Sequence, residues 1–126
     1  LEEHIAHHRH VHDLYAMFFA DMEGIILHHA PNADYRPNYW LSTILIDPEK
    51  TGFDYEQLRV ALDAANVETR PLWKPMHLQP VYKDNPCYVD GTSEKLFQKG
   101  LCLPAGPWVT DEDVRYIVDT IKEAIV

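Results

Sequence analysis

Nine prolines, the first at Pro31 and the last at Pro107, limit how long the strands of this 126-residue chain can be. Proline fixes φ and has no backbone N–H, so it lies at the ends of helices and strands and interrupts them elsewhere. Residues 1–22 contain neither proline nor glycine, whereas the middle of the chain is divided into short pieces. This distribution predicts a long first helix, followed by short strands and helices in alternation.

Apolar residues recur at three- and four-residue steps through residues 1–22, which predicts an amphipathic helix that Gly24 ends. Asp54 and Thr110 are N-caps of two further predicted helices, and Asp113 completes a short capping box with Thr110. The predicted helices cover residues 1–22, 55–66, 90–99 and 110–124, the strands cover 25–28, 38–46, 67–70 and 101–103, and 47–52 is a turn. This order predicts an α+β domain in which a small, mostly antiparallel sheet packs against helices.

Length and charge restrict the function classes. One domain over residues 1–126 is expected at this length. Eleven basic and twenty acidic residues give a net charge of −9, which disfavours nucleic acid as a partner. The apolar runs fall far below the roughly 20 residues of a membrane helix, and no signal region is evident. Cys87 and Cys102 form no CxxC pair, which predicts a reduced, cytoplasmic protein, with a single disulfide as the alternative.

Five histidines lie within nine residues of the first predicted helix: His4, His7, His8, His10 and His12. His4, His8 and His12 share one helix face, and imidazoles at this spacing can hold a transition metal. The alternative is a solvated helix face. Because a zinc site usually takes further ligands from elsewhere in the chain, we expect no functional metal site.

A proline-rich segment over residues 69–82 carries the residues best suited to bind a ligand. Three prolines within ten residues hold its backbone at low entropy cost. Its side chains include a guanidinium, an indole, an amine, an imidazole, an amide and a phenol. Together these groups are suited to binding a diphosphate joined to a sugar. The alternative is a rigid surface loop with a buried Leu72 and Trp73. The residues that carry these groups are Arg70, Trp73, Lys74, His77, Gln79 and Tyr82.

The same segment resembles a known family. Thr69-Arg70-Pro71-Leu72-Trp73-Lys74-Pro75-Met76-His77-Leu78-Gln79-Pro80, with Asn38-Tyr39-Trp40-Leu41 before it, is similar to the C-terminal part of the DegT/DnrJ-type nucleotide-sugar aminotransferases. These enzymes depend on pyridoxal phosphate (PLP) and have the aspartate aminotransferase fold, fold type I. The greatest similarity is to the branch that makes 4-amino-4,6-dideoxy sugars on UDP for pilin and surface-polysaccharide glycosylation.

The resemblance implies a division of labour within a longer protein. Family members hold PLP on a lysine of a large N-terminal domain, and none of the six lysines here stands in a similar context. The chain also begins without methionine inside a predicted helix. We therefore expect the small C-terminal domain alone, with residues 1–22 as a linker helix and 24–126 as the α+β domain. The expected partners are the N-terminal PLP-binding domain, a nucleotide sugar and, in the parent, a second subunit of a homodimer.

By resemblance, this domain supplies substrate-binding residues and no catalytic or cofactor-binding ones. Arg70 and Lys74 would bind the phosphates, and Asn38 would close the loop beside the same cleft. His77 and Gln79 would bond the sugar or the diphosphate, and Trp73 and Tyr82 would form walls. For Arg70 the alternative is a bracing pair with a carboxylate. We expect the isolated chain to be inactive and without cofactor. The alternative function is a stand-alone, non-enzymatic binding or oligomerisation module.

Overall fold

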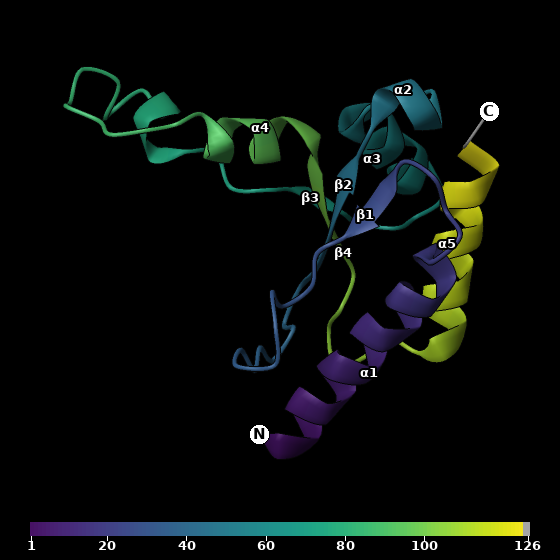
Figure 1. The fold of residues 1–126 in the computed structure, drawn as a ribbon. Helices are drawn as coiled ribbons and strands as arrows, with labels where there is room; N and C mark the ends of the chain where they lie inside the picture. The colour runs from purple at the N-terminus through teal and green to yellow at the C-terminus, as the bar shows by residue number, and fades with distance from the viewer. Residues whose placement is uncertain (125–126) are drawn as a thin grey trace.

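The computed structural model describes residues 1–124 and is built around one four-stranded sheet (Figure 1). Its strands are β1 (Ile25–Leu27), β2 (Ser42–Ile46), β3 (Arg70–Pro71) and β4 (Gly100–Leu103), in the spatial order β1-β2-β4-β3. All three neighbouring pairs are antiparallel. The α+β class and the small antiparallel sheet are therefore confirmed.

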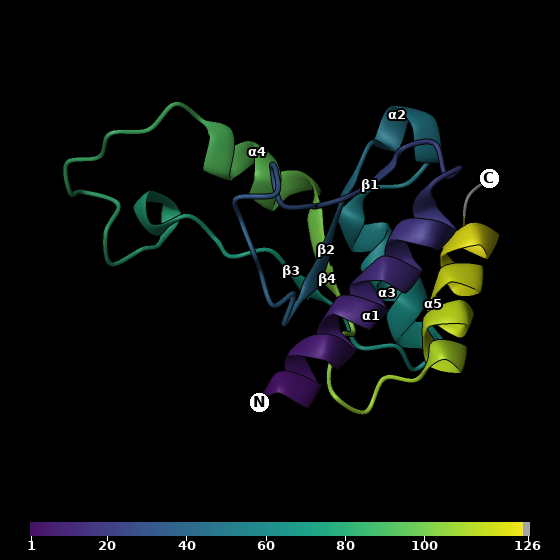
Figure 2. The ribbon, with the colours of Figure 1, turned by 60° about the horizontal axis from the view of Figure 1, so that its bottom comes forward.

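Three long helices cover one face of the sheet: α1 (Glu2–Phe19), α3 (Tyr55–Ala64) and α5 (Asp111–Ala124) (Figures 1 and 2). Apolar side chains of alternate β2 residues face them, because successive side chains of a strand point to opposite faces. The core forms where these two layers meet, and it includes Val11, Tyr15, Ile44, Ile46, Leu58, Leu62, Leu101, Leu103, Val114 and Ile121.

Both predicted N-caps are present, and the predicted capping box at Thr110 is joined by a second one at Asp54. The Asp54 carboxylate accepts the Gln57 N–H at 2.8 Å, and the Gln57 side chain accepts the Asp54 N–H at 2.9 Å. At the start of α5, the Thr110 hydroxyl accepts the Asp113 N–H at 3.1 Å, and the Asp113 carboxylate accepts the Thr110 N–H at 2.9 Å. Local side-chain chemistry therefore sets where both helices begin.

Residues 72–99, which we name the arm, leave the sheet after β3 and return to it at β4 (Figures 1 and 2). The arm contains a 3-10 helix, η1 (Met76–Leu78), and α4 (Thr92–Lys99). Residues 81–90 are all exposed, and no arm residue belongs to the buried core of residues 1–124. The arm is thus held mainly at its two ends.

The strand predicted over residues 38–46 begins only at Ser42. Asn38 bends the chain instead, because its side-chain oxygen accepts the Trp40 N–H at 3.2 Å. Tyr39 then takes a left-handed conformation, with φ 51°, and its ring stacks on His12 at 3.6 Å between centroids. A side-chain hydrogen bond and an aromatic contact therefore override the β-propensity of this segment.

The strand predicted over residues 67–70 lies at Arg70–Pro71 instead. Since Arg70 pairs with Cys102, the same register would set Glu68 opposite Pro104, which has no N–H to donate. The predicted turn over 47–52 contains a short helix, α2 (Pro48–Thr51), which Asp47 caps.

The other predicted bounds are wrong by two or three residues at most. The helices predicted to reach residues 22 and 66 end at Phe19 and Ala64, and the one predicted from residue 90 begins at Thr92. The strands predicted over 25–28 and 101–103 cover Ile25–Leu27 and Gly100–Leu103. Within residues 1–124, no helix combines the length and the apolar character needed to cross a membrane.

Candidate functional site

His77 is the sequence-predicted site residue with the best-defined surroundings. It lies in η1, and its Nε2 donates to Oε1 of Glu94 on α4 at 2.7 Å. The His77 side chain is 15% exposed and that of Glu94 is 36% exposed, so the pair is only partly screened by solvent. His77 and Tyr82 line one cavity of about 270 Å³ within the arm.

Trp73 and Asn38 line a second cavity, of about 590 Å³, between the start of the arm and the loop before β2. The ring of Trp40 lies 6.1 Å from that of Trp73, and Arg36 and Tyr35 also line the cavity. Trp73 is 66% exposed, so the alternative that it is a buried loop residue is wrong. The two tryptophans offer flat surfaces against which a planar ring could pack.

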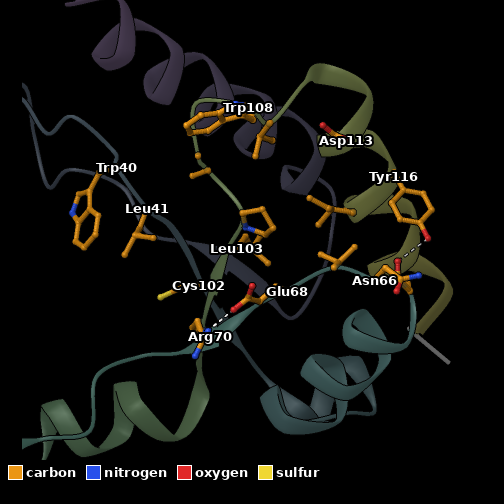
Figure 3. A pocket seen from close by; sticks show the side chains of 17 residues that line it. Trp40, Leu41, Asn66, Glu68, Arg70, Cys102, Leu103, Trp108, Asp113 and Tyr116 are labelled. Atoms are coloured by element: carbon orange, nitrogen blue, oxygen red, sulfur yellow. Dashed lines mark hydrogen bonds and ion pairs between the residues drawn. The ribbon is translucent and has the colours of Figure 1, made fainter. Parts of the chain in front are cut away.

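Arg70 lines a third, large cavity, of about 690 Å³, and a smaller one of about 330 Å³ beside Trp40 and Trp73. Figure 3 shows Arg70 and Glu68 at one end of the large cavity and Trp108 at the other. The Arg70 Nε donates to Glu68 at 2.9 Å. Arg70 therefore makes the carboxylate pair that the sequence left as its alternative role.

Lys74 and Gln79 shape the arm backbone. The Gln79 amide donates to the Lys74 carbonyl at 3.3 Å, and neither residue lines the cavities described above. The predicted residues therefore fall into two separate groups, His77 with Tyr82 and Trp73 with Asn38, and Arg70 borders the second group.

Three histidines of α1 contact the connection after β4 and the first residue of α5. His7 donates to the Gly106 carbonyl at 3.1 Å, His8 donates to that of Ala105, and His10 contacts Asp111 at 2.7 Å. A solvated face is therefore wrong for His7 and His8, whereas His4 and His10 are exposed. No group of three or more histidine, cysteine or acidic side chains within residues 1–124 is placed to hold a metal ion.

His12 is buried and belongs to a polar cluster beneath the second cavity. Its Nε2 lies 3.1 Å from Nδ1 of His29, and its Nδ1 lies 3.5 Å from the Ser42 hydroxyl. Burial and the neighbouring His29 lower the pKa of His12 to about 4. His12 is therefore neutral at pH 7. The cluster fixes the loop that carries Asn38 through the stacked Tyr39 ring.

Two residues near these cavities could not be predicted as site residues from the local sequence pattern. Glu94 stands 17 residues after His77, on a different helix, so no local spacing connects them. Trp108 is 85% exposed and borders the large cavity, although only its place next to Pro107 sets it apart in the sequence. Both contacts depend on how the arm and the β4–α5 connection fold back.

A lysine that holds an aldehyde cofactor such as PLP must place its amine inside a cavity. All six lysines are exposed, and none lines the cavities described above. They are Lys50, Lys74, Lys83, Lys95, Lys99 and Lys122. Residues 1–124 therefore do not fit a Schiff-base cofactor by themselves.

Comparison with solved structures places the fold among sugar aminotransferases of fold type I. One match is DesI in the presence of its TDP-sugar product, with TM-score 0.81 and 25% identity over 96% of this chain and 31% of that chain. A family model, the DegT/DnrJ/EryC1/StrS aminotransferase family, matches residues 1–122. The chain belongs to this family.

Two sequence relatives indicate the scale of the complete proteins. The putative pyridoxal phosphate-dependent aminotransferase EpsN of Bacillus subtilis is 33% identical over 88 residues, covering 67% of this chain and 22% of EpsN. GDP-perosamine synthase of Escherichia coli O157:H7 is 29% identical over 122 residues, covering 97% of this chain and 32% of the synthase. The chain thus spans about a third or less of the length of these relatives.

Proposed function

We propose that this chain is the C-terminal small domain of a PLP-dependent aminotransferase that aminates a keto group of a nucleotide-linked deoxy sugar. The family match over residues 1–122 and the much greater length of the relatives support this placement. Residues 1–22 would serve as the linker helix and 24–126 as the α+β domain, of which 125–126 lie outside the described residues. The proposed setting is cytoplasmic synthesis of sugars for pilin or surface-polysaccharide glycosylation.

The observation that carries the proposal is the arm, which brings His77 and Tyr82 to one cavity and places Trp73 with Asn38 at another. The aromatic walls suit a base or sugar ring. The imidazole and the Asn38 amide suit hydroxyl groups, which need directed hydrogen bonds. Lys74, Gln79 and Arg70 are the remaining residues of the proposed substrate-binding site.

PLP would be held by the N-terminal domain of the parent, and it would supply the electron sink for amino transfer there. This chain would contribute substrate binding alone. We expect PLP followed by borohydride to give no specific adduct in intact mass spectra beyond that of an exposed-lysine control. A stoichiometric adduct at one lysine would overturn this division.

UDP is the proposed nucleotide, on the resemblance of residues 69–80 to one branch of the family. One relative, GDP-perosamine synthase, is named for a GDP-sugar, and the DesI structure was determined in the presence of its TDP-sugar product. The test is therefore a titration of the ¹⁵N-labelled chain with UDP-, GDP- and TDP-sugars, followed by NMR of the three indole N–H signals. We expect the Trp40 and Trp73 signals to move most with the UDP-sugar and the Trp108 signal to stay.

A second candidate function is a stand-alone binding or oligomerisation module. It is favoured by the apolar exposure of the arm, where Val81 is 75% and Tyr88 is 100% exposed. Self-association in sedimentation experiments, together with unmoved indole signals at millimolar nucleotide sugar, would favour the module. Movement of the Trp40 and Trp73 signals would favour the aminotransferase domain, which in the parent would form a homodimer.

A further inference from the structure

We propose that Glu94 is a positioning residue that fixes His77 so that its free Nδ1 contacts the sugar rather than the diphosphate. The inference rests on the proposed function, and it decides between the two partners that the sequence left open for His77. It also adds a residue that lies outside the proline-rich segment.

The geometry fixes one nitrogen of the imidazole. Glu94 Oε1 lies 2.7 Å from His77 Nε2, and a carboxylate can only accept, so the Nε2 proton is engaged. The neutral ring carries one proton, so Nδ1 is then a hydrogen-bond acceptor. Tyr82 lines the same cavity, so its hydroxyl is a second hydrogen-bonding group for a ligand there.

The charge of the pair argues against the diphosphate. With a neutral imidazole the His77–Glu94 pair carries a charge of −1, and with a protonated one it carries none. A partly buried carboxylate repels a phosphate, because this interaction is screened less than in bulk water. A hydroxyl carries no such penalty and can donate to Nδ1. The pair is thus suited to a neutral, hydroxyl-bearing ring.

A cation elsewhere in the arm is available for the phosphates. Lys74 makes no ion pair within residues 1–124, whereas Arg70 is already engaged by Glu68. The size of the His77 cavity agrees with separate sites for the sugar and the phosphates. Its volume of about 270 Å³ is smaller than that of pockets that enclose a drug-sized ligand, which measure about 300–1,000 Å³. It accommodates one sugar ring and not a complete nucleotide sugar.

The first test reads the His77 tautomer in the free chain by long-range ¹H–¹⁵N NMR at pH 8, with the signal assigned from a His77→Gln variant. We expect His77 to carry its proton on Nε2. Glu94→Ala should remove this bias, and Glu94→Gln, whose carbonyl still accepts, should largely retain it. Glu123→Ala, at an exposed position of α5, is the matched control. A wild-type ring protonated on Nδ1 would overturn the proposal.

The second test separates sugar from diphosphate by comparing UDP with UDP-N-acetylglucosamine. Glu94→Ala should weaken binding of the nucleotide sugar about fivefold, the usual effect of one neutral hydrogen bond, and change UDP affinity less than twofold. Equal losses for both ligands, or a loss confined to UDP, would overturn the proposal. If neither ligand bound the wild-type chain, the proposed function would fail too, whereas the tautomer would still report the pairing.

Discussion

At the scale of single residues, His12 gives the clearest pH dependence. Its pKa falls from 6.5 to about 4 on folding, so the unfolded chain binds its proton first as the pH drops. The stabilisation is therefore complete above pH 6.5 and is lost as the pH falls towards 4. Between pH 7.5 and 5 we expect this one group to lower the free energy of unfolding by about 2 kcal/mol. Urea titrations at both pH values measure it.

The control for His12 separates it from the other seven histidines. His12→Phe keeps an aromatic ring against Tyr39 but removes the titration, so the difference between pH 7.5 and 5 should shrink. Phenylalanine at His4, which is exposed, should leave the wild-type difference unchanged. A His12→Phe variant with the full wild-type pH dependence would show that the loss arises elsewhere, for example at His28, His29 or Asp13, which face His12.

Residue types are easier to predict from this sequence than residue partners. The prolines around His77 and Trp73 indicate a rigid, chemistry-bearing segment by their spacing alone. Glu94 cannot be found in this way, because its contact with His77 spans 17 residues and depends on how the arm returns. The partners of His7 and His8 lie about a hundred residues away, after β4, which no local pattern reveals.

At the scale of elements, Gly100 decides how closely the arm joins the sheet. A Cβ at this position would lie 2.0 Å from Leu72 Cδ1 and 2.8 Å from the Leu96 carbonyl oxygen, so side chain and backbone would both have to move. We expect Gly100→Ala to destabilise the chain by about 1–3 kcal/mol in urea titrations. Gly106→Ala has open space and should be nearly neutral. Equal effects of the two substitutions would contradict this account.

The Thr110 cap should contribute measurably to α5. Replacing it by alanine leaves the Asp113 N–H without its side-chain acceptor, and we expect a loss of about 1 kcal/mol in the free energy of unfolding. Thr120→Ala is the matched control in the same helix, because alanine favours a helix interior. If both variants lost the same stability, capping would not be the cause.

Helix starts could be predicted closely and strand limits could not. Asp54 and Thr110 act through neighbours three residues away, so local chemistry is sufficient. The limits of β2 and β3 depend instead on what lies opposite: the His12 ring beside Tyr39, and Pro104 in the register of β4. Strand pairing is set by long-range contacts, which a single sequence does not display.

At the scale of the whole molecule, the chain consists of the arm and the remainder of the described residues, 1–71 and 100–124, which we name the body. The body holds the buried core, while the arm carries His77, Trp73 and the cavity lined by η1 and the loop after it. The family match over residues 1–122 includes both. Since the core lies in the body, we expect substitutions at arm positions such as His77 to alter the proposed binding with little effect on the free energy of unfolding. Function is often carried in this way by a segment that a rigid scaffold presents.

Limited trypsin digestion should reveal this division, since Lys83 is the one basic residue of the described arm that is exposed in a loop and not followed by proline. Arg36, Arg70 and Lys74 each precede proline, which blocks trypsin, and the other basic residues lie in helices. We therefore expect a first cut after Lys83, giving fragments 1–83 and 84–126, and mass spectrometry under denaturing conditions identifies them. Lys83→Gln should delay this cut.

The two fragments should stay together after the cut. β2 and β4 pair over four residues, and α1 packs against α5, so the core joins both sides of Lys83. Gel filtration should give one peak of intact size, with an unchanged far-ultraviolet circular dichroism spectrum. Separation of the fragments would show that the arm, and not the body, holds the two halves of the chain together.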